Sequence, residues 1–194
     1  LEKNHPDLIT WNSPTNLGKG SAVRQGIALS TGDILVIQDA DLELDPEDYK
    51  DLLVPILNEQ VDIVYGSRFL KPTGKAPFTA RLANRVLTLF TNILFGGHLT
   101  DMETAYKLFR RSVLQGLRLR CVRYDFEAEF TAKMLRKGYQ ITEVPIHYNP
   151  RTREAGKKIS WMDGADAIYP LVRCRFLEKV EPSYPPYTYA KKPP

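Results

Sequence analysis

The stretch Ile-Leu-Val-Ile-Gln-Asp-Ala-Asp, residues 34–41, joins an apolar run directly to two carboxylates. Four branched aliphatic residues in succession are typical of a strand that is buried on both faces of a parallel sheet. In open α/β sheets ligands bind beyond the carboxyl ends of the strands, which is where Asp39 and Asp41 stand. Two carboxylates at this spacing suit Mg²⁺ or Mn²⁺ carrying substrate phosphates. The alternative is that Asp41 begins a turn leading into a helix after Asp45-Pro46.

The segments around this stretch predict alternating strands and helices. We expect a strand at residues 8–11 and a helix at about residues 21–30 before it, and a helix from Asp45-Pro46 and a strand at residues 61–66 after it. This order of elements predicts an α/β fold with a mostly parallel sheet and right-handed connections.

The second half of the chain continues the pattern. Its expected elements are an amphipathic helix carrying apolar residues 82–94, a strand at the sheet edge with outward cations at residues 106–111, a helix at residues 126–137, an edge strand at residues 141–148 and a helix at residues 161–176. For residues 82–94 a helix facing the core is favoured over one lying on a membrane. We expect one domain over residues 1–177 and an extended or disordered Pro/Tyr-rich tail over residues 178–194.

The Gly18-Lys19-Gly20 turn before the first helix has two interpretations. Its backbone N–H groups and the Lys19 side chain can bind a phosphate at the helix N-terminus. The Walker A spacing is absent, so a plain tight turn is the alternative.

Composition limits the class of protein. The chain has 194 residues, of which 43% are hydrophobic and 26% charged, as in ordinary globular domains. Its net charge of +4 favours anionic partners. The charge does not distinguish between phosphates, acidic lipids and nucleic acid as the partner. The three histidines lack zinc-ligand spacing, and Cys121 and Cys174 form no Cys-x-x-Cys pair. No signal peptide or membrane-spanning run is recognisable, so a reducing, cytoplasmic setting is expected.

The order of the motifs along the chain identifies a protein family more specifically than any single motif does. They are the Gly-Lys-Gly turn, the strand into Asp-Ala-Asp, Gly-Ser-Arg at residues 66–68, Asp-Met-Glu-Thr at residues 101–104, Val-Pro-Ile at residues 144–146 and a basic loop at residues 151–158. This arrangement, which runs from Asn16 to Asp163, resembles the family 2 glycosyltransferases of the GT-A fold. Within them it is most similar to the branch that transfers a sugar onto dolichyl or undecaprenyl phosphate. The family's first two strands are not found before residues 8–11, so the catalytic domain is expected to be N-terminally incomplete.

The resemblance implies a role for each matching residue. It places Asp39 and Asp41 at the divalent cation on the donor diphosphate, and Asp101 at the position of the catalytic carboxylate. The donor would also be bound by Lys19 and by a closing basic loop that contains Arg153, Lys157 and Lys158. Arg68 and Arg81 would bind the acceptor phosphate. Glu43 stands where some relatives have a glutamine near the metal, and whether it binds the cation is left open.

The implied reaction is attack of the acceptor oxygen on the anomeric carbon of a UDP- or GDP-linked hexose, with inversion. A phosphate acceptor is already anionic, so Asp101 is expected to orient it or to stabilise the oxocarbenium-like centre. The first alternative is a transferase acting on a saccharide hydroxyl, which the pair Arg68 and Arg81 disfavours because a neutral acceptor needs no cations. The second is a non-catalytic assembly module. A nucleic-acid partner is not expected, because the basic loop lacks interleaved aromatic residues.

Overall fold

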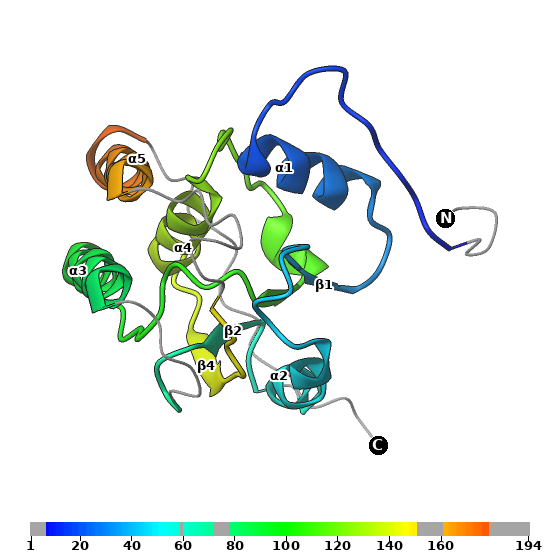
Figure 1. The fold of residues 1–194 in the computed structure, drawn as a ribbon, viewed down its shortest axis with the longest axis horizontal. Coiled ribbons are helices and arrows are strands. Elements are labelled where there is room, and N and C mark those ends of the chain that lie inside the picture. Colours follow the sequence, from blue (N-terminus) through cyan, green and yellow to red (C-terminus); the bar gives the residue numbers. More distant parts are fainter. Residues whose placement is uncertain (1–6, 59, 72–77, 151–160, 179–194) are drawn as a thin grey trace.

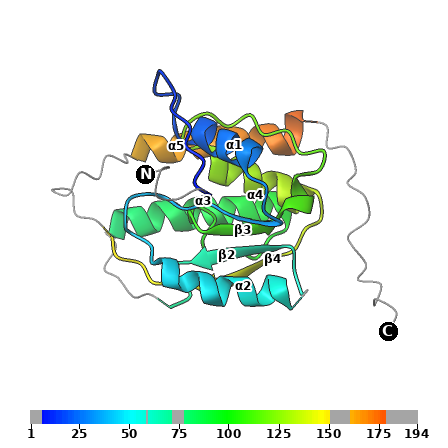
Figure 2. The same cartoon turned by 90° about the vertical axis from the view of Figure 1, so that its right-hand side faces the viewer.

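The computed structural model describes residues 7–58, 60–71, 78–150 and 161–178. Its elements are α1 (Lys19–Leu29), β1 (Ile34–Val36), the 3₁₀ turn η2 (Pro46–Asp48), α2 (Tyr49–Leu57), β2 (Ile63–Ser67), α3 (Phe78–Phe95), β3 (Lys107–Arg110), the 3₁₀ turn η3 (Arg111–Leu114), α4 (Phe126–Arg136), β4 (Ile141–Pro145), α5 (Trp161–Val172) and the π-helical turn η4 (Arg173–Leu177). The sheet forms the middle layer, with α2 on one face and α1, α3, α4 and α5 on the other (Figures 1 and 2).

The four strands lie in the order β1-β3-β2-β4. Strand β2 pairs parallel with β4, and β3 pairs antiparallel with both β1 and β2, so that β1, β2 and β4 run in one direction. The predicted α/β class is therefore confirmed. The outer position of β4, predicted from Pro145, is also confirmed, because a proline cannot donate to a further strand.

The expectation for β3 was wrong. This strand lies between β1 and β2 rather than at an edge, and Lys107, expected to point outward, is fully buried. Strand β1 is instead an outer strand of the described sheet, and only its central residue, Leu35, is buried. Strand order depends on contacts between distant segments, which the local pattern of a four-residue strand does not contain.

The core fills both sides of the sheet. Along β2, Ile63 and Tyr65 face the cluster formed with α3, α4 and α5, whereas Val64 faces the cluster formed with α2. All five residues of β2 are buried. Strand β2 is thus the strand that fits the expectation of burial on both faces, and its carboxyl end is held rigidly in place.

Local sequence signals placed some elements correctly and one incorrectly. The Asp45 carboxylate accepts a hydrogen bond of 2.9 Å from the backbone N–H of Glu47, and Pro46 opens η2, as predicted for this helix start. The strand expected at residues 8–11 is not formed, and its side chains are exposed. Apolar, β-favouring residues form a strand only where a neighbouring strand and a packing surface are available.

Helix α3 fits only in part the expectation that its apolar side faces the core, because Phe90 and Leu94 pack against the core whereas Leu82, Val86, Leu89 and Ile93 are exposed. The buried positions are Asn84, Leu87, Thr88 and Thr91, which are mostly polar. Five apolar side chains at helical spacing are instead 50% to 72% exposed: Phe78, Leu82, Val86, Leu89 and Ile93. We call these five residues the α3 stripe. Within the described residues, no helix has the length and apolar character needed to cross a membrane.

Helix α4 is buried around its whole circumference, and this includes its charged residues. Glu129 accepts hydrogen bonds from the backbone N–H groups of Arg120 and Cys121, and its Oε1 lies 2.6 Å from Lys133 Nζ and 2.7 Å from Arg173 Nη2. These partners come from α4 itself, from the loop before it and from η4. Buried charges are tolerated when they are paired and hydrogen-bonded in this way.

Candidate functional site

The loop that follows β1 is held by a side-chain amide. Gln38 Oε1 accepts hydrogen bonds from the hydroxyl groups of Tyr49, at 2.5 Å, and Tyr106, at 2.7 Å. The amide nitrogen of Gln38 in turn donates to the Asp39 carbonyl at 2.6 Å. The two tyrosine rings also contact each other, with centroids 5.2 Å apart. The backbone that carries Asp39 is therefore fixed from α2 and from the start of β3.

Asp39 belongs to a charged group that joins three elements. Lys19 Nζ, at the start of α1, lies 2.7 Å from Asp39 Oδ2 and 2.6 Å from Glu127 Oε1 of α4. Burial disfavours the charged amine, but the two carboxylates outweigh burial and raise the pKa of Lys19. Burial likewise opposes ionisation of Glu127, but Lys19 and Lys107 lower its pKa. Lys19 is thus held as a cation beside Asp39.

The Gly18-Lys19-Gly20 turn packs closely against residues 121–123. The N–H groups of Gly20 and Ser21 donate to the carbonyls of Arg123 and Val122, at 2.7 and 3.0 Å. A Cβ atom on Gly20 would come within 2.8–3.0 Å of backbone atoms of residues 121–123, so the glycine allows this close packing. The N–H groups of Gly20 and Ser21 thus form the tight packed turn of the second interpretation, and the Lys19 side chain reaches Asp39.

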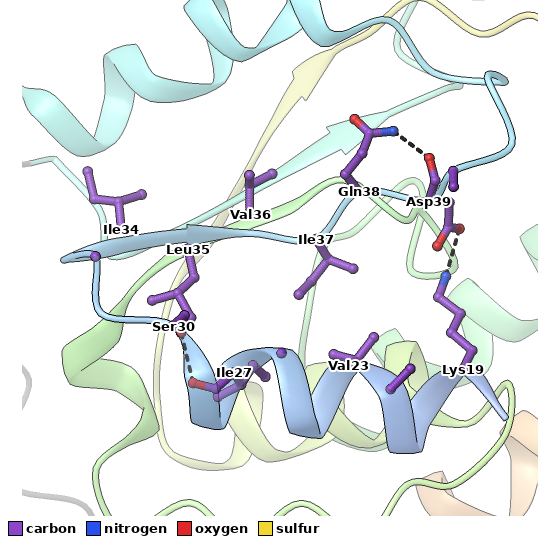
Figure 3. Close-up of a pocket in the computed structure, with 14 residues that line it drawn as sticks. Lys19, Val23, Ile27, Ser30, Ile34, Leu35, Val36, Ile37, Gln38 and Asp39 are labelled. Atoms are coloured by element: carbon purple, nitrogen blue, oxygen red, sulfur yellow. Dashed lines mark hydrogen bonds and ion pairs between the residues drawn. The ribbon is translucent and has the colours of Figure 1, made fainter. Parts of the chain in front are cut away.

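A cavity of about 530 Å³ lies between α1 and β1 (Figure 3). Val23 and Ile27 from α1 and Leu35 and Ile37 from the β1 segment point into it from opposite sides. The Lys19–Asp39 pair closes one end. The walls are apolar and the charges gather at one end, next to the carboxyl end of β1.

The residues after Asp39 fit a divalent cation that is bound together with a ligand. Asp41 Oδ1 accepts a hydrogen bond of 3.1 Å from the N–H of Glu43, and Leu42 between them is 87% exposed with a φ of 60°. A leucine in the left-handed region is strained, and such strain is frequent at binding loops. The described residues contain no cluster of three or more side chains suited to a metal. Mg²⁺ and Mn²⁺ are commonly bound by one or two carboxylates plus substrate phosphates. Asp39 and Asp41 are two carboxylates of this kind.

A second charged centre lies at the carboxyl end of β2. Arg68 Nε and Nη2 donate to the two carboxylate oxygens of Asp101 at 2.7 and 2.8 Å, and the Arg68 N–H donates to Asp101 Oδ2 at 3.0 Å. The Asn84 amide, from α3, donates to Asp101 Oδ1 at 2.9 Å. Asp101 is fully buried, which would raise its pKa, but Arg68 outweighs burial and lowers it. Asp101 is thus an ionised anchor that fixes one edge of the Arg68 guanidinium.

Arg81 is exposed on α3, one turn before Asn84. The structure therefore brings Arg68 and Asp101 into direct contact and places Arg81 on the helix that supplies their third partner. Glu143 of β4 holds this centre from the other side, because it accepts hydrogen bonds from the backbone N–H groups of Thr100 and Asp101.

The predicted basic residues Arg153, Lys157 and Lys158 lie outside the described residues. The chain that leads to them is described, and it runs beside the Asp39–Asp41 loop. The N–H of Asn149 donates to the carbonyl of Glu43 at 2.8 Å, and Leu44 forms a β-bridge with Tyr148. The segment after β4 therefore leaves the sheet next to the carboxylate loop.

Three charged residues near the site were missed by the sequence analysis: Lys107 and Glu127, which are buried, and Glu103, which is partly buried. Lys107 was interpreted as an outward cation, whereas Glu127 was included only as part of a predicted helix and Glu103 only as part of a motif. Lys107 Nζ instead donates to the carbonyls of Met102 and Thr104 and lies 4.0 Å from the centroid of the Tyr65 ring. The only available signal was a lysine inside the apolar run Ala-Tyr-Lys-Leu-Phe, residues 105–109.

The family model described as Glycosyl transferase family 2 matches residues 1–118. The chain is 32% identical over 146 residues to a UDP-N-acetylglucosamine–dolichyl-phosphate N-acetylglucosaminyltransferase from Methanococcus voltae, with 72% of this chain and 58% of that protein covered. It is 31% identical over 155 residues to an undecaprenyl-phosphate mannosyltransferase from Micrococcus luteus, with 75% and 63% covered. The chain thus spans less than two thirds of the length of these relatives.

The fold is similar to that of solved glycosyltransferase structures. Glucosyl-3-phosphoglycerate synthase from Mycobacterium tuberculosis, crystallised with Mn²⁺, UDP and phosphoglyceric acid, superimposes with a TM-score of 0.62 at 19% identity. The match covers 92% of this chain and 59% of that chain. At this identity the similarity concerns the fold, and it agrees with the predicted GT-A architecture.

Proposed function

The chain belongs to glycosyl transferase family 2, and from this membership we propose that it transfers a hexose from a nucleotide diphosphate sugar to a polyprenyl phosphate. The observation that carries the proposal is the Arg68–Asp101 pair at the carboxyl end of β2. A buried carboxylate fixes one edge of the guanidinium, and a planar cation oriented in this way suits a phosphate. The named relatives that act on dolichyl and undecaprenyl phosphate support the same acceptor class.

The donor would bind at the carboxyl end of β1. Asp39 and Asp41 would hold a divalent cation, which supplies charge stabilisation to the departing nucleoside diphosphate. Lys19, kept protonated by Asp39 and Glu127, adds a positive charge beside the same carboxylate. The solved neighbours that contain Mn²⁺ with UDP support a donor of this kind. Arg153, Lys157 and Lys158 are proposed to close over the diphosphate from the segment that leaves β4.

The acceptor would bind between Arg68 and Arg81. Its phosphate oxygen is already anionic near neutral pH, so attack on the anomeric carbon does not require a strong base. Asp101 then acts by orienting Arg68, since both of its carboxylate oxygens already accept hydrogen bonds from Arg68 and Asn84. Inversion follows from attack on the face opposite the leaving diphosphate.

Transfer to a phosphate can be tested with a matched acceptor. We expect a radiolabelled panel of UDP- and GDP-hexoses, incubated with the protein and Mn²⁺, to label farnesyl phosphate but not farnesol, which differs only by the phosphate. The assay measures radioactivity in the organic phase. Labelling of a saccharide with no labelling of farnesyl phosphate would support a hydroxyl acceptor instead. If a nucleoside diphosphate with Mn²⁺ also failed to raise the melting temperature, the chain would be a non-catalytic assembly module.

A polyprenyl phosphate acceptor lies in a membrane, so we propose that the protein acts at a membrane surface, at the cytoplasmic face. The α3 stripe supports contact with a membrane surface. The stripe runs along the helix that carries Arg81 and Arg85, both exposed, and the combination of apolar side chains with flanking cations suits an anionic lipid surface. The predicted core-facing orientation does not hold for Leu82, Val86, Leu89 and Ile93, and their exposure supports the alternative of a membrane-lying helix.

We expect Leu89→Glu and Ile93→Glu each to reduce binding to vesicles that contain phosphatidylglycerol. Removing one inserted apolar side chain costs about 1.5–3 kcal/mol, or roughly a tenfold loss of binding or more. Vesicle flotation gives the measurement. The control is Leu57→Glu, an equally exposed leucine on α2, which covers the other face of the sheet. Equal losses in all three variants would remove the membrane role of the stripe.

A further inference from the structure

The four residues that follow β4, residues 146–149, connect the two charged centres of the site, and we call them the linking segment. At its start, the N–H of Ile146 donates to the carbonyl of Ser67, the last residue of β2, at 3.1 Å. Towards its end, Tyr148 forms the β-bridge with Leu44, in the loop that follows β1. The backbone of the linking segment is therefore bonded both to the end of β2 and to the loop that carries the two aspartates.

A buried carboxylate holds the middle of the linking segment. Asp48, the last residue of η2, is only 4% exposed. One of its carboxylate oxygens accepts a hydrogen bond of 2.8 Å from the backbone N–H of His147, and the other lies 2.7 Å from His147 Nδ1. The backbone is thus fixed directly before Tyr148 as well as at Tyr148 itself, which limits the freedom of the Tyr148 ring to move.

The Tyr148 ring lies against the guanidinium group of Arg68. Its centroid is 5.3 Å from Arg68 Cζ, within the range of a cation–π contact. Tyr148 is 9% exposed, so the contact is largely shielded from water, which strengthens it. Asp101 holds one edge of the same guanidinium through two N–H groups. The Arg68 side chain is therefore held at an edge by Asp101 and at a face by Tyr148.

We propose that Tyr148 is a positioning residue of the acceptor site. Its ring holds the Arg68 guanidinium in the orientation that binds the acceptor phosphate, and its backbone fixes this cation relative to the loop that follows β1. This inference rests on the proposed function. A cation that is oriented before the ligand arrives loses less conformational entropy on binding, so the affinity for the phosphate is higher. Tyr148 acts in this way through Arg68.

A purely structural role is the alternative, because Tyr148 also belongs to the apolar cluster that includes buried residues of α2. The two roles predict different results. If Tyr148 only stabilises the fold, replacing it should affect the binding of both substrates to the same extent. If it positions Arg68, the loss of affinity should be confined to the phosphate acceptor and should depend on the aromatic ring.

Calorimetric titrations with farnesyl phosphate, and with UDP plus Mn²⁺, separate these roles without any transfer reaction. Tyr148→Leu removes the aromatic face, and we expect the Kd for farnesyl phosphate to rise about three- to tenfold through loss of the cation–π contact. Tyr148→Phe keeps the face, so its Kd should stay within about twofold of the native value. Both variants should bind UDP with Mn²⁺ as the native protein does, because the bridge to Leu44 is made by backbone atoms.

The matched control is Phe109→Leu, which removes a fully buried ring from the cluster on the other face of the sheet. This variant should lower the melting temperature but leave both affinities unchanged. If Tyr148→Leu does not fold, Tyr148→Met takes its place, since its flexible side chain fills the space of the ring without an aromatic face.

Arg68→Gln tests whether Tyr148 acts through Arg68. The glutamine amide is planar and keeps N–H donors for Asp101, but it has no positive charge. Effects of two residues that act as one unit are not additive. In the Arg68→Gln protein, Tyr148→Leu should therefore change the Kd for farnesyl phosphate by less than about twofold.

The proposal would be overturned by an unchanged farnesyl phosphate affinity in Tyr148→Leu, by equal losses in Tyr148→Leu and Phe109→Leu, or by equal losses in Tyr148→Leu and Tyr148→Phe. None of these comparisons requires Arg68→Gln to fold. The same factor for Tyr148→Leu with Arg68 and with Gln at this position would also overturn it. A farnesyl phosphate affinity that Arg68→Gln leaves unchanged would instead overturn the proposed acceptor site, on which the inference rests.

Discussion

Replacing Asp41 with asparagine is expected to reduce sugar transfer by about a thousandfold or more while the fold is kept. The substitution removes one of two carboxylates that would share a hard cation, and a metal ion of this kind contributes several kcal/mol of charge stabilisation in a transition state. The side-chain oxygen of asparagine can still accept the hydrogen bond from the N–H of Glu43, so the loop should retain its conformation.

Metal binding gives a direct measurement beside activity. Electron paramagnetic resonance of Mn²⁺ in the presence of UDP should show a bound fraction for the native protein and far less for Asp41→Asn. Asp51→Asn, which alters an exposed aspartate on α2, is the matched control and should behave as the native protein does. Full turnover by Asp41→Asn, or by the native protein in excess EDTA, would contradict the assignment of the metal site.

Removing Arg68 is expected to affect both stability and acceptor use. Arg68→Ala leaves the fully buried Asp101 carboxylate without its bidentate partner, and breaking a buried ion pair from one side costs about 3–5 kcal/mol. For a chain of this size we expect the melting temperature to fall by roughly 10 °C. The apparent KM for farnesyl phosphate should rise much more than the KM for the nucleotide sugar, because the donor is proposed to bind at β1.

Two further variants separate the loss of stability from the loss of acceptor binding. Asp101→Asn should lose comparable stability but keep the cation, so its KM for farnesyl phosphate should rise less than that of Arg68→Ala. Lys50→Ala, at an exposed position of α2, should change neither quantity. Equal increases of the two Michaelis constants in Arg68→Ala would place this residue in the fold or at the donor, and not at the acceptor.

The Arg68–Asp101 ion pair makes the free energy of unfolding depend on pH. The pKa of Asp101 is lowered in the folded protein, so the stability that Asp101 contributes is present above the ordinary carboxyl pKa and is lost as the pH falls through the folded value. In urea unfolding, the difference between the native protein and Asp101→Asn should therefore be largest near neutral pH and should shrink as the pH falls below about 4.

Local chemistry explains which parts of the fold were predictable. The start of η2 at Asp45-Pro46, the end of α4 before Gly138 and the outer position of β4 each depend on a few adjacent residues, and each was read correctly. The α3 stripe shows the limit of periodicity, because regular spacing reveals that one side of a helix is apolar but not what that side faces. Strand β3 shows the same limit for sheets, since its two partners are distant in the chain.

The candidate site was also only partly predictable, because the burial of its charged residues depends on contacts between distant segments. Motifs identified Lys19, Asp39, Arg68 and Asp101, and the structure joins them in two ion pairs. Lys107, Glu127 and Glu103 escaped notice because a charged residue in a sequence is usually at the surface. Their burial becomes apparent only when α4 packs against the sheet and brings carboxylates and amines from separate segments together.

The burial of α4 also bears on how the chain folds. Its charged side chains find partners in α1 through Lys19, in the loop at residues 118–121 and in η4 through Arg173. A folding intermediate with α4 docked but any of these segments absent would contain an unpaired charge away from water. Such intermediates are disfavoured, so α1, α4 and η4 should form late and together, and the described chain should lose them in one cooperative step rather than by successive local openings.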